Sequence, residues 1–345
     1  MGRTQALGRV GWILPVVCLV ALAVGSGCAT SRSRSSLADK QVVLPAHVAL
    51  PDGFYPLAGH YCPDNPGDHY DGWPRYVVGT RDKAIMAYVP AQTFLMGGGD
   101  DPDTVPPREV VVDHFYMDIH EVTNARFHRF GKRRCSVGAY REYWTPGLND
   151  DHPVRNVSWE EALRYSKWAC KELPTEAQWE AAARGDDGRI FPWGNDPHSE
   201  TTRFLCNAHT GRGDFDGYAY TAPAFSFAPG VSPFGIFQMA GNVAEWCDDW
   251  YDPGRYAYPS PDDPAMGLER GPLPFGDAYY PNPGDKHIRE GRVGPLLGDE
   301  RVVRGGSFAV PIEHCRVDGR RAARPGARLF DVGFRCVLTL PPSGH

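Results

Sequence analysis

Glycine and proline recur so often along this chain that long regular elements have little room to form. The sequence holds 39 glycines and 32 prolines, which is 71 of its 345 residues. Proline breaks the hydrogen bonding of a helix interior, and glycine weakens helices and strands alike. Such a content is high for a helical bundle or a doubly wound sheet. We therefore expect a loop-rich fold, in a chain long enough for one large or two ordinary domains.

Two helices are nonetheless well specified by local signals. Ser158 is followed three residues later by Glu161, and Thr175 is followed by Gln178 in the same way, so each pair predicts a capping box at a helix start. Apolar residues at helical spacing follow both pairs. Gly185 stands where a glycine is expected to end the second helix.

The remaining regular structure is predicted to be short strands. The segment from Arg108, REVVVDHFYMDIHEVT, mostly alternates apolar and polar residues. The segment DVGFRCVLTL near the end also alternates, which predicts one final strand with Cys336 facing the core. Between them lies a long insertion at 252–299, rich in proline, glycine and aromatic residues. Loops of this length are usually binding loops or disordered, and the aromatics favour an ordered, packed loop.

The first residues have the pattern of an export signal. Arg3 and Arg9 precede an apolar run at 11–24, and small residues precede Cys28. We predict a lipoprotein-type signal peptide at 1–27 and an acylated Cys28 that starts a flexible tether at 28–50. An uncleaved anchor is the alternative, but the run is shorter than the ~20 residues that span a bilayer. Ala29 favours the outer membrane, so we expect a lipid anchor in a bacterial cell envelope, facing the periplasm or the surface.

The net charge bears on the class of partner, and the cysteines bear on disulfide and metal binding. The formal net charge of −6 gives no reason to expect nucleic acid. Export would place seven cysteines in an oxidising compartment with their pairing open: Cys62, Cys135, Cys170, Cys206, Cys247, Cys315 and Cys336. His60, Cys62, His69 and Asp71 lie in the segment 51–83, but their spacing fits no zinc pattern, and an irregular N-terminal extension is the interpretation we favour.

Five motifs occur in order along the chain: LPTEAQWEAAARG from Leu173, FPWG from Phe191, MAGNVAEW from Met239, RGGSF from Arg304 and GFRC from Gly333. Together they resemble the motifs of the formylglycine-generating, or sulfatase-modifying-factor, family. The resemblance covers residues 84–340. It implies an α+β fold, a variant of the C-type-lectin-like fold with small twisted sheets and few helices. It also implies that Glu176 and Arg184 serve in a structural ion pair.

The resemblance also implies calcium. The loop GRGDFDGY from Gly211 brings acidic residues and glycines together, as oxygen-donor cation sites require, although the same residues are common in turns. The family's positions for a first calcium correspond to Asn207, Ala208, Asp216 and Tyr218. Those for a second correspond to Gln238, Gly241, Val243 and Glu245. Gln238 stands where asparagine is found in the relative compared, so its side chain has a longer reach.

Copper is where the chain departs from the family's oxidases. In these oxidases two thiolates after the serine of RGGSF hold cuprous copper, an ion that suits soft donors. Counted from Ser307, the first thiol position is Val310 and the second is Cys315. Cys315 alone cannot hold copper, and no other cysteine is placed by the sequence to substitute. Cys315 could instead be a nucleophile beside His314 and Arg316, a buried thiol, or half of a disulfide.

Two function classes follow. The first is an exported, membrane-tethered and catalytically degenerate domain that binds or scaffolds a peptide or glycan, through a groove near Ser307 and the 252–299 loop. The second is a formylglycine-generating-type oxidase that modifies an exported protein, with Ser307 and Cys315 as its candidate catalytic residues. The missing thiol at Val310 favours the first class.

Overall fold

A computed structural model describes residues 44, 48–57, 59–60, 67, 69–70, 72–131, 142–197, 204–209, 216–254, 256 and 298–341. The chain divides into Met1–Gln41 and Val42–His345, and every described residue belongs to the second unit. The predicted signal peptide, Cys28, Cys62, Cys135 and most of the 252–299 insertion lie outside the described residues. No helix in the described part of the chain is long and apolar enough to cross a membrane.

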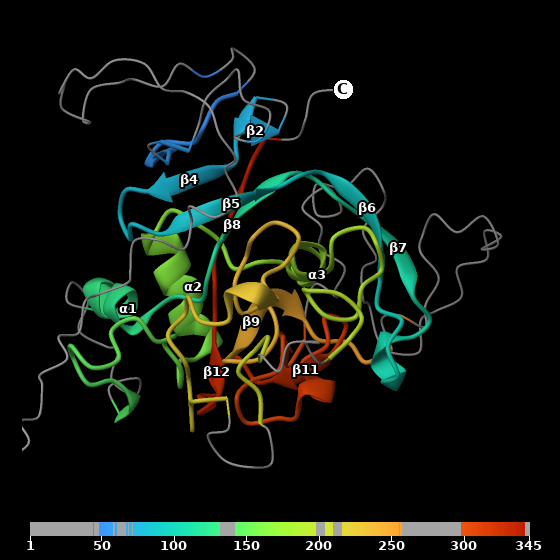
Figure 1. The fold of residues 1–345 in the computed structure, drawn as a ribbon. Coiled ribbons are helices and arrows are strands. Elements are labelled where there is room, and N and C mark those ends of the chain that lie inside the picture. Colours follow the sequence, from blue (N-terminus) through green and yellow to red (C-terminus); the bar gives the residue numbers. More distant parts are fainter. Residues whose placement is uncertain are drawn as a thin grey trace, which may run out of the picture. The chain divides into compact units, whose positions relative to one another are not determined.

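The larger sheet is antiparallel throughout and contains five strands in the order β1-β4-β5-β8-β13. These strands are β1 (Phe54–Pro56), β4 (Tyr76–Gly79), β5 (Ile85–Val89), β8 (Phe115–Asp118) and β13 (Val337–Thr339). Strands β1 and β4 come from the segment 51–83, so part of that segment joins the sheet (Figure 1). A separate pair is formed by β2 (His69–Tyr70) and β3 (Trp73–Pro74).

The second sheet contains four strands and carries the loop that includes Ser307. Its order is β11-β10-β9-β12, from β9 (Ala244–Trp250), β10 (Arg301–Arg304), β11 (Arg320–Ala323) and β12 (Val332–Gly333). Strand β12 runs parallel to β9, and the other pairs are antiparallel. Strands β6 (Gln92–Met96) and β7 (Arg108–Val112) form a two-stranded ribbon that extends to one side in Figure 1.

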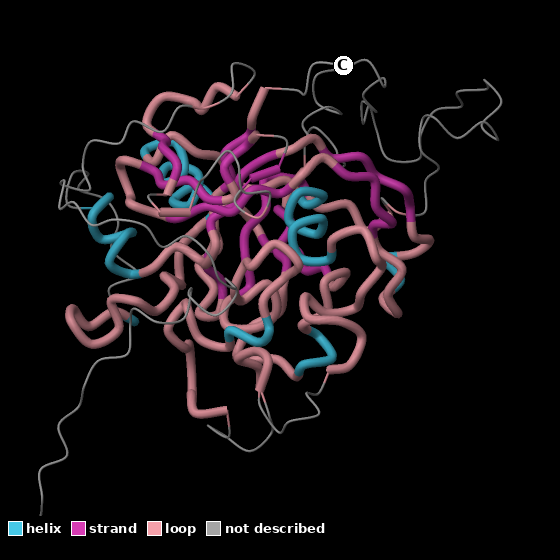
Figure 2. Tube along the Cα trace, turned by 45° about the horizontal axis from the view of Figure 1, so that its top comes forward, coloured by secondary structure: helices cyan, strands magenta, loops and turns pink. Residues whose placement is uncertain are grey.

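The described α-helices are short: α1 (Asn124–Gly131), α2 (Trp159–Trp168) and α3 (Glu176–Arg184). Helices α2 and α3 begin where their capping residues predict. Both capping boxes form, with Ser158 accepting a hydrogen bond from the Glu161 amide and Thr175 accepting one from the Gln178 amide. Loops dominate the rest of the trace (Figure 2), together with the 3₁₀ turns Pro102–Thr104, Ala228–Gly230 and Ile312–His314.

The prediction of one continuous final strand is wrong. Residues 332–333 pair with β9 in the four-stranded sheet, whereas residues 337–339 pair with β8 in the five-stranded sheet. Cys336 is fully buried, as predicted, but so is its neighbour Arg335. Alternation fails here because the chain passes between the two sheets and is buried on both sides.

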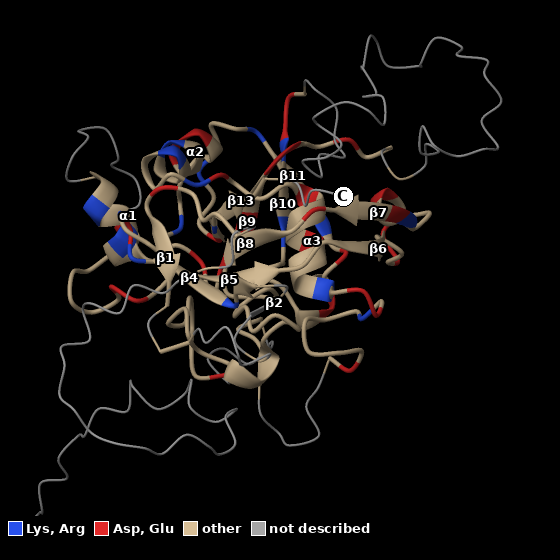
Figure 3. Cartoon of the chain, turned by 90° about the horizontal axis from the view of Figure 1, so that it is seen from above, with Lys and Arg blue, Asp and Glu red and all other residues tan. Residues whose placement is uncertain are grey.

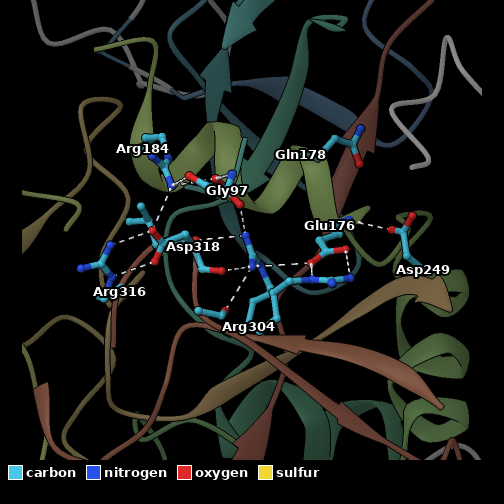
Figure 4. A network of polar contacts seen from close by, with 12 residues as sticks. Gly97, Glu176, Gln178, Arg184, Asp249, Arg304, Arg316 and Asp318 are labelled. Atoms are coloured by element: carbon cyan, nitrogen blue, oxygen red, sulfur yellow. Dashed lines mark hydrogen bonds and ion pairs between the residues drawn. The ribbon is translucent and has the colours of Figure 1, made fainter. Parts of the chain in front are cut away.

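A buried ionic network joins α3 to β10 and β11 (Figure 4). Arg304 forms ion pairs with Glu180 and, at 3.5 Å, with Glu176. The Arg320 Nε donates to Glu176 Oε1 at 2.6 Å, while Arg184 pairs with Glu180 at 2.8 Å. Glu176 and Arg184 are therefore structural, as the family resemblance implies, but each pairs with other residues. The arginine of RGGSF thus holds its strand against α3.

A second buried charge cluster lies beside the five-stranded sheet, at the end of β8. The Lys171 Nζ is 2.7 Å from Asp82 Oδ2 and 2.6 Å from Asp118 Oδ1, and the lysine and Asp82 side chains are fully buried. Tyr165 donates to Asp82 at 3.2 Å. Burial lowers the pKa of Lys171, but the charges of Asp118 and Asp82 outweigh it and raise that pKa, so Lys171 carries its charge inside the core.

Charged positions elsewhere are of both signs. Helix α2 carries Glu160 and Glu161 with Lys167, and α3 carries Glu176 and Glu180 with Arg184. Figure 3 shows blue and red positions interspersed around these helices. This mixture agrees with the modest net charge of the sequence.

Candidate functional site

The segment that follows β10 is the centre of the candidate site. Gly305 and Gly306 both have positive φ, and the next residue, Ser307, is fully buried. The Ser307 Oγ donates to Asp331 Oδ2 at 2.9 Å, and Arg321 pairs with the same carboxylate at 2.8 Å. Ser307 is therefore held in a hydrogen-bonded loop beneath the surface.

The thiol predicted near Ser307 is buried as well. Cys315 has no exposed surface, and its Sγ lies 3.7 Å from the Pro311 carbonyl oxygen and 4.0 Å from that of Ser307. Burial raises the pKa of Cys315 to about 12. A thiolate nucleophile needs a shift in the opposite direction. His314 is exposed while Cys315 is buried, so the imidazole does not accompany the thiol into the interior.

Val310 occupies the first thiol position without the chemistry of a thiol. Its side chain is half-buried and packs against the cluster that contains Cys315. Its carbonyl oxygen accepts a hydrogen bond from the His209 amide at 2.8 Å. The loop after Ser307 therefore supplies one sulfur atom rather than two.

The residues predicted for the second calcium lie at the turn before β9 and at the start of that strand. Gln238 has a left-handed backbone with φ of 54°, and its Nε2 donates to the Ser226 carbonyl at 3.2 Å. Its Oε1 is buried and has no hydrogen-bond partner among the described residues. A buried amide oxygen that accepts no hydrogen bond is a suitable ligand for a hard cation, because such cations bind amide and carbonyl oxygens.

Glu245 in this site is already partly engaged. Its Oε2 accepts from Trp179 Nε1 at 2.9 Å and from Arg335 Nε at 2.7 Å, and its Oε1 accepts from Arg335 Nη2 at 2.7 Å. A carboxylate oxygen can accept about two hydrogen bonds, so Oε1 keeps one acceptor position. Glu245 could offer a cation only that oxygen.

Glu121 is a residue of this site that the sequence analysis missed. It is fully buried, its Oε1 accepts from Asn242 Nδ2 at 2.9 Å, and its Oε2 has no hydrogen-bond partner in the described part of the chain. Burial raises the pKa of Glu121 to about 8, with the nearby Glu245 charge acting in the same direction. In the sequence it appears only as one acidic residue of the alternating segment from Arg108, three positions after the end of β8.

The residues predicted for the first calcium are partly brought together. Asn207 is buried, and its Nδ2 donates to the Tyr220 carbonyl at 2.8 Å and to Asn242 Oδ1 at 3.0 Å. Asp216 Oδ1 accepts from the Tyr218 amide at 3.1 Å, which forms a tight turn. Asn207 thus lies against the segment that carries Asp216 and Tyr218. Residues 210–215 between them are outside the described residues.

A group of rings, of which Tyr220 and Phe330 are exposed and Phe308 is buried, surrounds one arginine beside Ser307, and we call it the aromatic platform. It consists of Tyr143, Arg155, Tyr220, Phe308 and Phe330. The Arg155 guanidinium lies 4.0, 5.7 and 5.5 Å from the ring centroids of Tyr143, Tyr220 and Phe308. Arg155 also donates to the Phe330 carbonyl at 2.6 Å. Tyr220 is 62% exposed and Phe330 is 50% exposed, so these rings face solvent.

Comparison with known proteins covers most of the chain. Residues 78–340 match the model of the sulfatase-modifying factor enzyme 1-like domain. The chain is 32% identical over 310 residues to the formylglycine-generating enzyme of Thermomonospora curvata, covering 73% of this chain and 92% of that protein. It is 31% identical over 229 residues to the inactive C-alpha-formylglycine-generating enzyme 2 of Mus musculus, covering 52% and 73%.

A solved structure supports the fold independently. PvdO from Pseudomonas aeruginosa superimposes with a TM-score of 0.59 at 22% identity, covering 75% of this chain and 96% of that one. Together with the family match, this similarity confirms the predicted fold class. At such identity the structural similarity concerns the fold alone.

Proposed function

Because this chain belongs to the sulfatase-modifying factor family, we propose that it is a member that binds an extended peptide at the aromatic platform and does not carry out the copper-dependent oxidation. One observation carries the proposal. The surface beside Ser307 presents the exposed rings of Tyr220 and Phe330 and an arginine, whereas the single thiol of the loop, Cys315, is fully buried.

The chemistry of the platform suits a protein partner. Tyrosine and arginine dominate binding energy at interfaces because they combine a large apolar area with a polar group. Formylglycine, which relatives are named for generating, is an amino-acid residue, so a peptide is the ligand class that we favour over a glycan. A relative named as inactive supports the idea that family members persist without the activity.

Calcium is the second part of the proposal. Gln238 Oε1 and Glu121 Oε2, with the remaining acceptor of Glu245 and the backbone carbonyls of Gly241 and Val243, would hold one ion. Asn207, Ala208, Asp216 and Tyr218 would hold another. Bound calcium would supply positive charge to buried acceptors and fix the loops beneath the platform. Export and acylation at Cys28 remain predictions from the sequence.

The peptide proposal predicts an affinity loss confined to the platform. A displayed library of random heptapeptides should yield binders, and a selected peptide should bind Tyr220→Ala or Phe330→Ala at least about tenfold more weakly, the ~1.4 kcal/mol typical of an exposed anchor residue. Isothermal titration calorimetry measures this. Tyr55→Ala, which removes another half-exposed ring from β1, should leave affinity unchanged.

Two outcomes would count against this proposal. Failure of the library to yield any binder would remove peptide recognition, and so would binders that are indifferent to the Tyr220 and Phe330 substitutions. Enrichment on a glycan array in place of peptides would assign the platform to a sugar.

The proposal also predicts the absence of oxidation. The purified chain, incubated with a cysteine-containing sulfatase-type peptide, cuprous copper, dioxygen and a thiol reductant, should give no aldehyde by mass spectrometry. The Thermomonospora curvata enzyme serves as the positive control. Aldehyde formed by the unmodified chain and abolished by Cys315→Ser would instead establish the oxidase alternative.

A further inference from the structure

Arg155 is the charged member of the aromatic platform, and its neighbours in the chain fix its backbone. The Val154 amide donates to the Val122 carbonyl at 2.8 Å. The Asn156 amide donates to the Val332 carbonyl at 3.1 Å, with a left-handed φ of 60° at Asn156. Arg155 therefore projects from a segment that is hydrogen-bonded on both sides.

Aromatic rings and one hydrogen bond orient the Arg155 guanidinium. It lies 4.0 Å from the ring centroid of Tyr143, and its Nη1 donates to the Phe330 carbonyl at 2.6 Å. The rings of Tyr220 and Phe330 each pack edge-on against Phe308, with centroids 5.9 Å apart in both pairs. A guanidinium held in this way is preorganised, so it loses less rotational freedom when it binds a ligand.

Arg155 differs from Arg321, a nearby arginine, because it has no carboxylate partner. Arg321 pairs with Asp331 at 2.8 Å. Among the residues that the structure describes, Arg155 forms no ion pair, and its one hydrogen bond is to a backbone carbonyl. Burial lowers the pKa of Arg155, and the more distant charges of Asp331 and Glu142 do not fully offset this effect. A carboxylate on a ligand would supply the missing counter-charge.

We propose that Arg155 binds a carboxylate of the peptide at the platform, so that the preferred ligand carries an acidic group next to apolar residues that contact the exposed rings. This inference rests on the peptide binding proposed above and specifies its ligand class. A guanidinium offers five N–H donors in a planar fork that matches the two oxygens of a carboxylate. The Phe330 carbonyl accepts from Nη1 alone.

The net charge of the chain makes this preference specific. With a formal net charge of −6, the chain as a whole repels acidic peptides. Enrichment of acidic peptides would therefore report a local site and not a general attraction. The carboxylate could belong to an aspartate or glutamate side chain or to the C-terminus of the peptide, since both present the same two oxygens.

The test is a double-mutant cycle between the chain and a heptapeptide selected from the library, followed by isothermal titration calorimetry. Changing the acidic side chain to its amide, or amidating the C-terminus, identifies the carboxylate. One of the two changes should weaken binding to the unmodified chain at least about tenfold. Arg155→Gln should bind the acidic and the amide peptide equally. Arg324→Gln, which removes the same charge from an exposed arginine just after β11, should retain the full preference.

The amide peptide also guards against a variant that folds poorly, because Arg155→Gln should bind it about as well as the unmodified chain does. Binders that depend on Tyr220 and Phe330 but show no preference for either carboxylate would overturn this inference and leave peptide binding intact. Full preference retained by Arg155→Gln would assign the carboxylate to another residue. A library without any binder would overturn both proposals.

Discussion

Replacing Lys171 by methionine should lower the free energy of unfolding by about 3–5 kcal/mol, the typical cost of removing one partner from a buried ion cluster. The lysine lies within 2.7 Å of two buried carboxylates, so its loss leaves Asp82 and Asp118 without a counter-charge. Tyr165 can still donate to Asp82, but a neutral hydroxyl cannot balance a charge. Urea denaturation followed by circular dichroism measures the change.

Lys167, in the last turn of α2 and four residues before Lys171, provides the matched control. Its ammonium lies 3.8 Å from Glu172, and the two side chains are 63% and 52% exposed. Lys167→Met should therefore change stability by less than about 1 kcal/mol, as exposed ion pairs do. Adding Asp118→Asn to Lys171→Met should recover part of the loss by removing one uncompensated charge. A loss for Lys171→Met as small as that for Lys167→Met would show that the core does not depend on this cluster.

Calcium should raise the melting temperature by roughly 5–10 °C over chelator, if the ion is present at ~100 times its dissociation constant and contributes ~2.7 kcal/mol. The physical reason is the pair of buried acceptors without hydrogen-bond partners among the described residues, Gln238 Oε1 and Glu121 Oε2. Differential scanning calorimetry in calcium and in EGTA measures the shift. Magnesium should have a smaller effect, because it demands a tighter octahedral arrangement.

The calcium prediction can be assigned to a site by substitution. Gln238→Leu should remove a large part of the shift, and Asp216→Asn should remove the part that belongs to the first site. Gln92 lies in the β6–β7 ribbon and donates to the Ala181 carbonyl of α3. Gln92→Leu should leave the calcium shift intact. Identical melting temperatures in calcium and in EGTA would exclude both proposed sites.

Some buried charges stabilise the fold, whereas other residues determine what the loops can bind. Arg304 of RGGSF forms a buried ionic network with the glutamates of α3, and Arg335 forms a separate buried ion pair with Glu245. Such groups stabilise the loops whatever the loops bind. The thiol position at Val310 and the rings of the platform instead decide which chemistry those loops can perform. Our functional proposal depends on this second group.

Features with short-range causes could be predicted from the sequence. A capping box needs only Ser158 and Glu161, or Thr175 and Gln178, because both hydrogen bonds close within one turn. Gly185 ends α3 because its positive φ of 69° suits glycine. The family motifs likewise identified the fold, since each is a contiguous run of residues.

Alternation in the final segment could not be interpreted correctly by itself. Residues 332–340 alternate as a strand with one buried side would, yet Arg335 is fully buried between Glu245 and backbone carbonyls of 237–238. A buried arginine is stable only where partners satisfy it, and these partners come from elsewhere in the chain. Only the tertiary structure could show that this segment belongs to two sheets.

The sequence by itself determined the helix starts, the family and its fold, and the absence of a thiol at position 310, because each depends on residues that are neighbours along the chain. The tertiary structure alone decided that Glu121 accepts a hydrogen bond from Asn242, that rings from separate loops gather around Arg155, and that Cys206 shares a cluster with Cys315. These contacts depend on how both sheets and their loops pack together, and a local sequence pattern does not predict how distant segments pack.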